Sequence, residues 1–222
     1  TLAIASIFKT QKETQLAFET QAEGTIALNF IKASKPYIPD NFEDITSYIN
    51  NLKLHFFDQV DFNNETLQSS NFLIDKMLNY VFGLSSKTKD DAVTYKENSD
   101  AVFLAMKQAS PQIKKELLEI LWQQMAALNL ETVANYISDE YLIEISKDLN
   151  DEKLVDELVL YKNLSIGAQA PDFSLEAVDA NTKTPELLSN LDAYENYIIV
   201  FWSSTCSHCL IEIPLLQTYL KT

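Results

Sequence analysis

Apolar residues recur at three- and four-residue intervals over most of residues 13–161, and this spacing is typical of helices with one buried face. Gly24 interrupts the first pattern, and Pro36 ends it because proline disfavours helix in the residue before it. Pro111 suits a first helical turn, where its missing amide hydrogen costs nothing. The predicted helices cover residues 13–33 (as one helix or two), 45–57, 72–81, 101–109, 112–128, 130–146 and 151–161, and the first eight residues are expected to continue as the first helix.

One apolar stripe follows a helix-start signal at residues 40–43, and we expect it to form part of the core. The polar segment 58–66 is expected to be a loop. His55 has polar neighbours on a predicted helix, which favours a structural role over a catalytic one. The residues of the stripe are Ile45, Tyr48, Ile49, Leu52, Phe56 and Phe57.

The helical spacing stops at residues 162–167, and we place a domain boundary between residues 163 and 164. Beyond it, residues 171–175 are expected to be extended and residues 184–188 to form a short helical turn. Residues 196–202 form a continuous apolar run, which predicts a strand buried on both faces. A helix is expected to follow from Cys206. The chain therefore divides into a helical domain, residues 1–163, and a smaller domain, residues 164–222.

The charge balance excludes two classes of partner. Seventeen basic and thirty-two acidic residues give a formal net charge of -15, so the surface repels nucleic-acid phosphates and anionic lipid headgroups. No apolar run approaches the ~20 residues that a membrane-spanning helix needs. We expect neither nucleic-acid binding nor a membrane span in this chain.

Cys206 and Cys209 carry the strongest chemical signal, and they are the chain's 2 cysteines. Their spacing allows a small disulfide to close and to reopen by exchange. A strand leading into a helix places the first helical amides and the positive end of the helix dipole beside Cys206, which favours its thiolate. We therefore expect Cys206 to attack and Cys209, one turn further and more buried, to resolve. His208 is expected to lower the pKa of Cys206 by a hydrogen bond or by its charge.

A cysteine pair can also serve a zinc site, a haem attachment or a static disulfide. Structural zinc needs four ligands, and the pair together with the distant His55 falls short. Covalent haem attachment needs histidine directly after the second cysteine, where Leu210 stands. A static disulfide remains open for a chain in an oxidising compartment, although so small a ring constrains the unfolded chain little.

The segment FWSSTCSHC, residues 201–209, with Pro214 five residues after the second cysteine, resembles the active-site segment of thioredoxin-like proteins. The segment IGAQAPDFSL, residues 166–175, resembles the entry segment of the TlpA-like, AhpC/TSA-related branch of that superfamily. The helical region is similar, more loosely, to the region before the thioredoxin-like domain in many bacterial cell-envelope members. The resemblance implies that Cys206 is the nucleophile, Cys209 the resolving thiol, Trp202 an active-site packing residue and Pro214 a helix kink.

The resemblance also implies a fold, an activity and a compartment. The fold would be mainly α, with a helical domain followed by an incomplete thioredoxin-like α/β domain. The activity would be thiol:disulfide exchange with extracytoplasmic protein thiols, in the periplasm or cell envelope of a bacterium. It would need a redox partner that recycles the pair, but no dissociable cofactor and no metal.

The chain ends at Thr222, before the later strands and the cis-proline loop of such a domain, so we expect it to be a truncated piece of a longer protein. A strand at residues 196–202 would then keep an exposed edge, which invites pairing with a second copy. The competing hypothesis is a non-catalytic helical binding or scaffold module with a vestigial or structural disulfide.

Overall fold

A computed structural model describes residues 2–84, 90–175, 186–193 and 195–220. The chain separates into two compact units, Thr1–Gln169 and Ala170–Thr222. The expectation of a mainly α-helical protein is confirmed. The domain boundary was placed after residue 163, whereas the compact units meet after Gln169. Among the helices in the described ranges, none is long and apolar enough to cross a membrane.

The first unit begins with four helices, and local signals fix their ends. Gly24 has a φ of +77°, a left-handed conformation between α1 and α2, so of the one or two helices expected over residues 13–33 the structure has two. Asp44 caps α3, because its carboxylate accepts a hydrogen bond from the Ser47 amide at 3.0 Å. The helices are α1 (Leu2–Gln21), α2 (Ala27–Ala33), α3 (Ile45–Leu54) and α4 (Glu65–Gln68).

The apolar stripe of α3 was expected to be core, and this prediction is wrong for the helix itself. No residue of α3 is buried, and Ile45 and Ile49 are 79% and 47% exposed. Phe56 and Phe57, which follow α3, do pack against the core. Periodicity identifies the apolar face of a helix, but burial needs another element to cover that face, and α3 is covered only in part.

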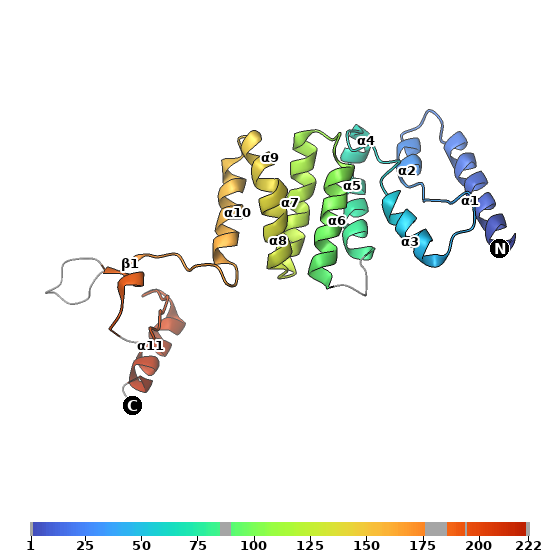
Figure 1. Cartoon of the computed structure of the whole chain (residues 1–222). Coiled ribbons are helices and arrows are strands. Elements are labelled where there is room, and N and C mark those ends of the chain that lie inside the picture. The colour runs from blue at the N-terminus through green and yellow to red at the C-terminus, as the bar shows by residue number, and fades with distance from the viewer. Residues whose placement is uncertain (1, 85–89, 176–185, 194, 221–222) are drawn as a thin grey trace. The chain divides into compact units, whose positions relative to one another are not determined.

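A row of packed helices forms the rest of the first unit (Figure 1). α7 packs against α8, and α9 packs against α10. Helices two apart in the order also touch: α6 contacts α8, α7 contacts both α5 and α9, and α8 contacts α10. Two π-helical turns, η1 and η2, continue α5 and α8. The elements are α5 (Phe72–Leu78), η1 (Asn79–Gly83), α6 (Asp91–Ala105), α7 (Pro111–Ala127), α8 (Glu131–Ile137), η2 (Ser138–Leu142), α9 (Ile143–Asp148) and α10 (Glu152–Leu164).

Some helix ends in this row follow local signals, but the helix predicted over residues 101–109 begins ten residues earlier, at Asp91, and ends at Ala105. Pro111 occupies the first turn of α7, and the Ser110 hydroxyl before it accepts a hydrogen bond from the Ile113 amide at 3.4 Å. Asn129 and Asn150 take left-handed conformations after α7 and α9, where asparagine is tolerated better than most residues. Local residue preferences therefore account for the turns on either side of α7 and after α9.

One contiguous core runs through the row of helices. In α7, Leu118, Leu121 and Met125 have no exposed surface. Similarly buried residues of the neighbouring elements surround them, so α7 lies at the centre of the core. These neighbours are Met77, Val81, Val102, Met106, Val133, Ala134, Ile137, Leu142 and Leu158.

The second unit contains a small hairpin and one helix. β1 (Ser174–Leu175) pairs antiparallel with β2 (Glu186–Leu187), and Ser174 lies opposite Leu187. The helical turn expected at residues 184–188 is wrong at Glu186–Leu187, while residues 184 and 185 lie outside the described part. Pairing with β1 overrides the local helical signal, and a 3₁₀ turn, η3 (Leu188–Asn190), follows. The extended conformation expected around residue 175 is confirmed at β1.

The buried strand predicted at residues 196–202 is also absent from the structure. The segment is irregular, and its side chains are exposed: Ile198 at 65%, Phe201 at 86% and Trp202 at 55%. A strand needs partners for its backbone N–H and C=O groups, and in the described part of this unit β1 and β2 pair with each other. The unit therefore lacks the central strand that its apolar sequence predicted.

Candidate thiol-disulfide site

Cys206 lies at the end of a tight turn that leads into α11 (Ser207–Tyr219). The Cys206 amide donates a hydrogen bond to the Ser203 carbonyl at 3.1 Å, and the Thr205 amide donates to the Ser203 hydroxyl at 3.2 Å. These bonds give Cys206 an extended conformation at the N-cap position, directly before the helix. The predicted start of a helix at Cys206 is confirmed.

The Cys206 sulfur is the cap of α11. It accepts a hydrogen bond from the Cys209 amide at 3.3 Å. Cys206 thus occupies the N-cap position, where serine or aspartate caps other helices. Both cysteines are free thiols and half-buried. One helical turn separates them, so the Cys209 thiol lies on the same side of the helix start as the Cys206 sulfur. The turn therefore brings the two predicted thiols together.

The pKa of Cys206 is lowered from its ordinary value. The largest cause is a hydrogen bond from the Cys209 thiol, followed by the Cys209 amide and then the His208 amide. Each of these donors stabilises the thiolate more than the thiol. The contribution of His208 to this shift is its backbone amide, and the predicted effect of its imidazole stays a prediction.

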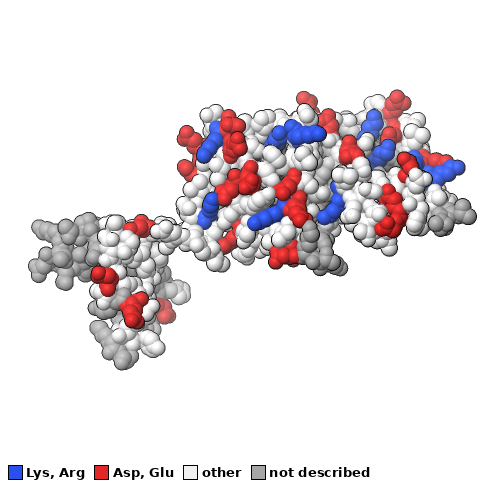
Figure 2. All heavy atoms as spheres, viewed as in Figure 1, with Lys and Arg blue, Asp and Glu red and all other residues white. Residues whose placement is uncertain are grey.

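The part of the second unit that the structure describes places no lysine or arginine near the thiolate. Residues 170–175, 186–193 and 195–220 contain no lysine or arginine, whereas Asp172, Asp192, Glu195 and Glu212 are acidic. Figure 2 shows basic side chains (blue) interspersed with acidic ones (red) over the helical unit, whereas the coloured side chains of the second unit are acidic. Among the described residues, the groups that favour a negative Cys206 are the hydrogen-bond donors at the helix start.

The other residues named from the sequence lie beside the pair but are not assembled around it. Trp202 is 55% exposed, so the packing role implied for it is not formed here. Pro214 lies inside α11, two turns after Cys206, where it has no amide hydrogen to donate to the Leu210 carbonyl. His208 is exposed. Within the described residues no group of three or more His, Cys, Asp or Glu side chains is placed to hold a metal ion.

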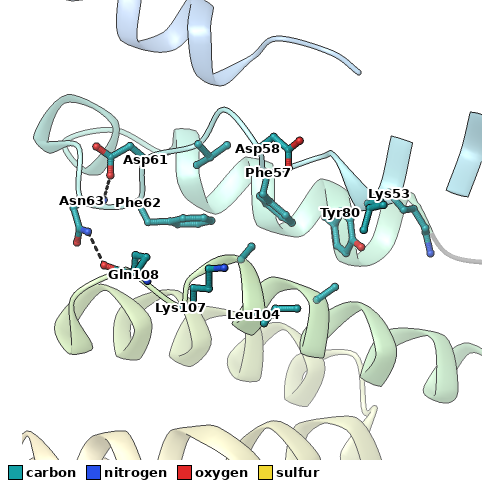
Figure 3. Close-up of a pocket in the computed structure, with 15 residues that line it drawn as sticks. Lys53, Phe57, Asp58, Asp61, Phe62, Asn63, Tyr80, Leu104, Lys107 and Gln108 are labelled. Carbon is teal, nitrogen blue, oxygen red and sulfur yellow. Dashed lines mark hydrogen bonds between the residues drawn. The ribbon is translucent and has the colours of Figure 1, made fainter. Parts of the chain in front are cut away.

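The helical unit also contains a pocket that the sequence did not predict. It lies between α6 and the segment that leads from α3 through Phe57 and Phe62, and Tyr80 of η1 contributes to it (Figure 3). Its residues come from three separated segments, so no local pattern marks it. The nearest signal was the group of aromatic residues next to the polar loop 58–66.

Comparisons with protein-family models, with curated proteins and with solved structures find no match for this chain.

Proposed function

We propose that the chain carries a thiol:disulfide exchange site, with Cys206 as the attacking thiol and Cys209 as the resolving thiol. The observation that carries the proposal is the position of Cys206 as the N-cap of α11. The Cys206 sulfur accepts a hydrogen bond from the Cys209 amide at 3.3 Å, and the pKa of Cys206 is lowered. A thiolate is the nucleophile in exchange, so a lowered pKa raises the reactive fraction near neutral pH.

The reaction follows two displacement steps that balance. The Cys206 thiolate attacks one sulfur of a disulfide, forms a mixed disulfide and releases the other sulfur as a thiolate. The Cys209 thiolate then attacks the Cys206 sulfur, forms the intramolecular disulfide and releases the second thiolate. Two electrons pass from the chain to the substrate, and a dithiol partner must return them. In keeping with the family resemblance, we place the reaction on protein thiols in the bacterial cell envelope.

Reaction with glutathione disulfide tests this assignment. Reduced wild type should release both glutathione thiols and end as an intramolecular disulfide. Cys209→Ser should stop at a mixed disulfide on Cys206 with one glutathione released, and Cys206→Ser should react much more slowly. Quantification of free glutathione and mass spectrometry of the chain distinguish these products. Equal rates of mixed-disulfide formation in the two variants would contradict the assigned roles.

The role of His208 has its own test. If its imidazole assists the thiolate, His208→Pro should raise the pKa of Cys206, and His208→Gln should retain part of the effect through its amide donor. Equal Cys206 pKa values in wild type and His208→Pro would confine the contribution of residue 208 to its backbone.

The second candidate function is a non-catalytic helical module with a structural or vestigial disulfide. It is favoured by the contiguous core of the helical unit, whose buried residues and the residues packed against them extend no further along the chain than Tyr161. A chain that remains oxidised and inert toward dithiothreitol and glutathione, while the helical unit stays folded, would support this alternative. A pair that cycles in the assay above would exclude it.

We further propose that two copies can associate through the irregular segment 196–202, whose apolar side chains are exposed. Backbone groups in such a segment can form a ladder with a second copy. Sedimentation velocity should then show a concentration-dependent dimer, and exchange of the 196–202 amides with solvent should slow as dimer forms. A monomer at all concentrations with protected amides would rule this pairing out.

A further inference from the structure

The helical unit contains a pocket of about 470 Å³, within the roughly 300–1,000 Å³ common for small-ligand sites. Phe57, Phe62 and Tyr80 form one wall, and the Phe57 and Tyr80 rings point toward α6 in Figure 3. Phe62 and Tyr80 are each 5% exposed, so their rings are held by the core. Leu54 and Leu104 also line the pocket and are 73% and 67% exposed. The pocket thus has a fixed aromatic wall and apolar residues that are open to solvent.

The basic and acidic side chains of the pocket point in different directions. Lys107 extends its ammonium group from the α6 side toward the aromatic wall, whereas the Asp58 and Asp61 carboxylates turn away from α6 (Figure 3). Asp58 is paired with the His55 imidazole at 2.7 Å, and Asp61 accepts the Asn63 amide at 2.9 Å. Lys107 makes no ion pair among the residues that the structure describes. Lys107 is therefore a cation on the pocket wall that is open to a negative ligand group.

A series of hydrogen bonds through the buried Asn98 fixes the opposite end of the pocket. Lys53 donates to the Asn98 side-chain carbonyl at 3.1 Å, and the Asn98 side-chain amide donates to the Val81 carbonyl at 2.9 Å. Val81 follows Tyr80 in the π turn η1, and π turns occur frequently at functional sites. Asn98 is 3% exposed, so these bonds hold Tyr80 and Lys53 in fixed positions at the pocket.

We propose that this pocket binds a small amphiphilic carboxylate, a ligand with an apolar body and a single negative head. The apolar body would lie against Phe57, Phe62 and Tyr80, and the head would receive a charge-assisted hydrogen bond from Lys107. A neutral ligand would leave the ammonium group without a counter-charge, and a cationic ligand would be repelled by it. The proposal concerns the helical unit alone and holds whether or not Cys206 is catalytic.

Isothermal titration of the reduced 222-residue chain with octanoate, octanol and octylammonium tests the ligand class. Octanoate should bind most tightly. Lys107→Met, which keeps the apolar stem, should weaken octanoate binding by about fivefold or more and leave octanol binding unchanged. The matched control is Lys147→Met, which removes the same charge from an exposed position of α9 and should change octanoate binding by less than about twofold.

Localisation requires a second measurement, because the second unit also exposes apolar side chains. Octanoate should shift the backbone NMR signals of residues 53–63 and 101–109, and Leu104→Asp should abolish these shifts. Leu104 is exposed, so this variant should fold as wild type does. The proposal is overturned if octanoate does not bind, if octanol binds as tightly, if the two lysine variants weaken octanoate equally, or if the shifts fall only in residues 196–220.

Discussion

Helices α7 and α11 are both rich in apolar residues, yet their surroundings differ completely. In α7, Leu117, Leu118 and Leu121 are at most 5% exposed. In α11, Leu210 and Leu215 are 55% and 59% exposed, and no residue of the helix is buried. The difference lies in the neighbours, since α7 is packed against α5, α8 and α9. An apolar residue contributes to stability only where other elements remove it from water.

The same two helices begin in the same way. Ser110 caps α7 through a hydrogen bond from the Ile113 amide, and Cys206 caps α11 through one from the Cys209 amide. Both caps lie three residues before their donors and have extended backbones. In α7 the bond can only stabilise the helix. In α11 the acceptor is a thiol, so the same bond also lowers a pKa.

The largest expected effect contrasts the two environments directly. Leu121→Ala should lower the free energy of unfolding of the helical unit by about 2–5 kcal/mol, because it removes a fully buried side chain and leaves a cavity. Leu215→Ala, the same chemical change in α11, should cost less than about 0.5 kcal/mol. Urea unfolding followed by circular dichroism measures both. Comparable losses would mean that α11 is covered in solution.

A smaller loss of stability is expected when the buried Asn98 is replaced. Asn98→Leu should lower the free energy of unfolding by about 1–3 kcal/mol, because the Val81 carbonyl then loses its side-chain donor in a buried place. Asn98→Asp also lacks the amide donor and should not restore stability. Urea unfolding of the two variants provides the measurement, and wild-type stability in either would show that Asn98 is not needed to satisfy the π turn.

The cap comparison predicts a still smaller effect. Ser110→Ala should cost about 1 kcal/mol, whereas Ser110→Asp should remain near wild type because aspartate also caps helices well. Thermal unfolding of the three chains in the same buffer gives the ranking. If Ser110→Ala and Ser110→Asp are equally unstable, the hydroxyl contributes through something other than the cap.

The smallest change concerns the titration of Cys206. Its folded pKa is depressed, so the hydrogen bonds to the thiolate contribute stability above the unfolded pKa, and this contribution is lost as the pH falls through the folded pKa. The rate of Cys206 alkylation by iodoacetamide should therefore reach half its maximum at a lower pH in the folded chain than in urea. Peptide mass spectrometry follows Cys206 alone. Coincident profiles in the two states would show that the cap does not act on the thiolate.

The sequence predicted those parts of the molecule that depend on local signals. Gly24, Pro111 and the start of a helix at Cys206 all mark ends that the structure confirms. Local signals failed where the outcome depends on distant partners. The segment 196–202 has the composition of a buried strand, but no strand in the described part of the chain lies beside it, and the α3 stripe has too little cover.

Of the candidate site, the two cysteines and the helix start were predictable, because they are adjacent in the chain. The Lys53–Asn98 hydrogen bond and the pocket lined by Lys107 were not, because they join residues from separate helices. A buried asparagine in the middle of a predicted helix gives no indication of which carbonyl it will meet. Asn98 donates to the carbonyls of Tyr80 and Val81 in the π turn of η1, and that turn has no clear sequence signal.

The sulfur of Cys206 is both the cap of α11 and the proposed nucleophile, and this double use links the oxidation state of the pair to the folding of the helix. A disulfide sulfur is neutral, so oxidation withdraws the negative acceptor from the first turn of α11. By thermodynamic linkage, anything that tightens this turn favours the dithiol and makes the disulfide a stronger oxidant. A partner that docks on the exposed face of α11 would thereby set the reduction potential of the pair without touching either cysteine.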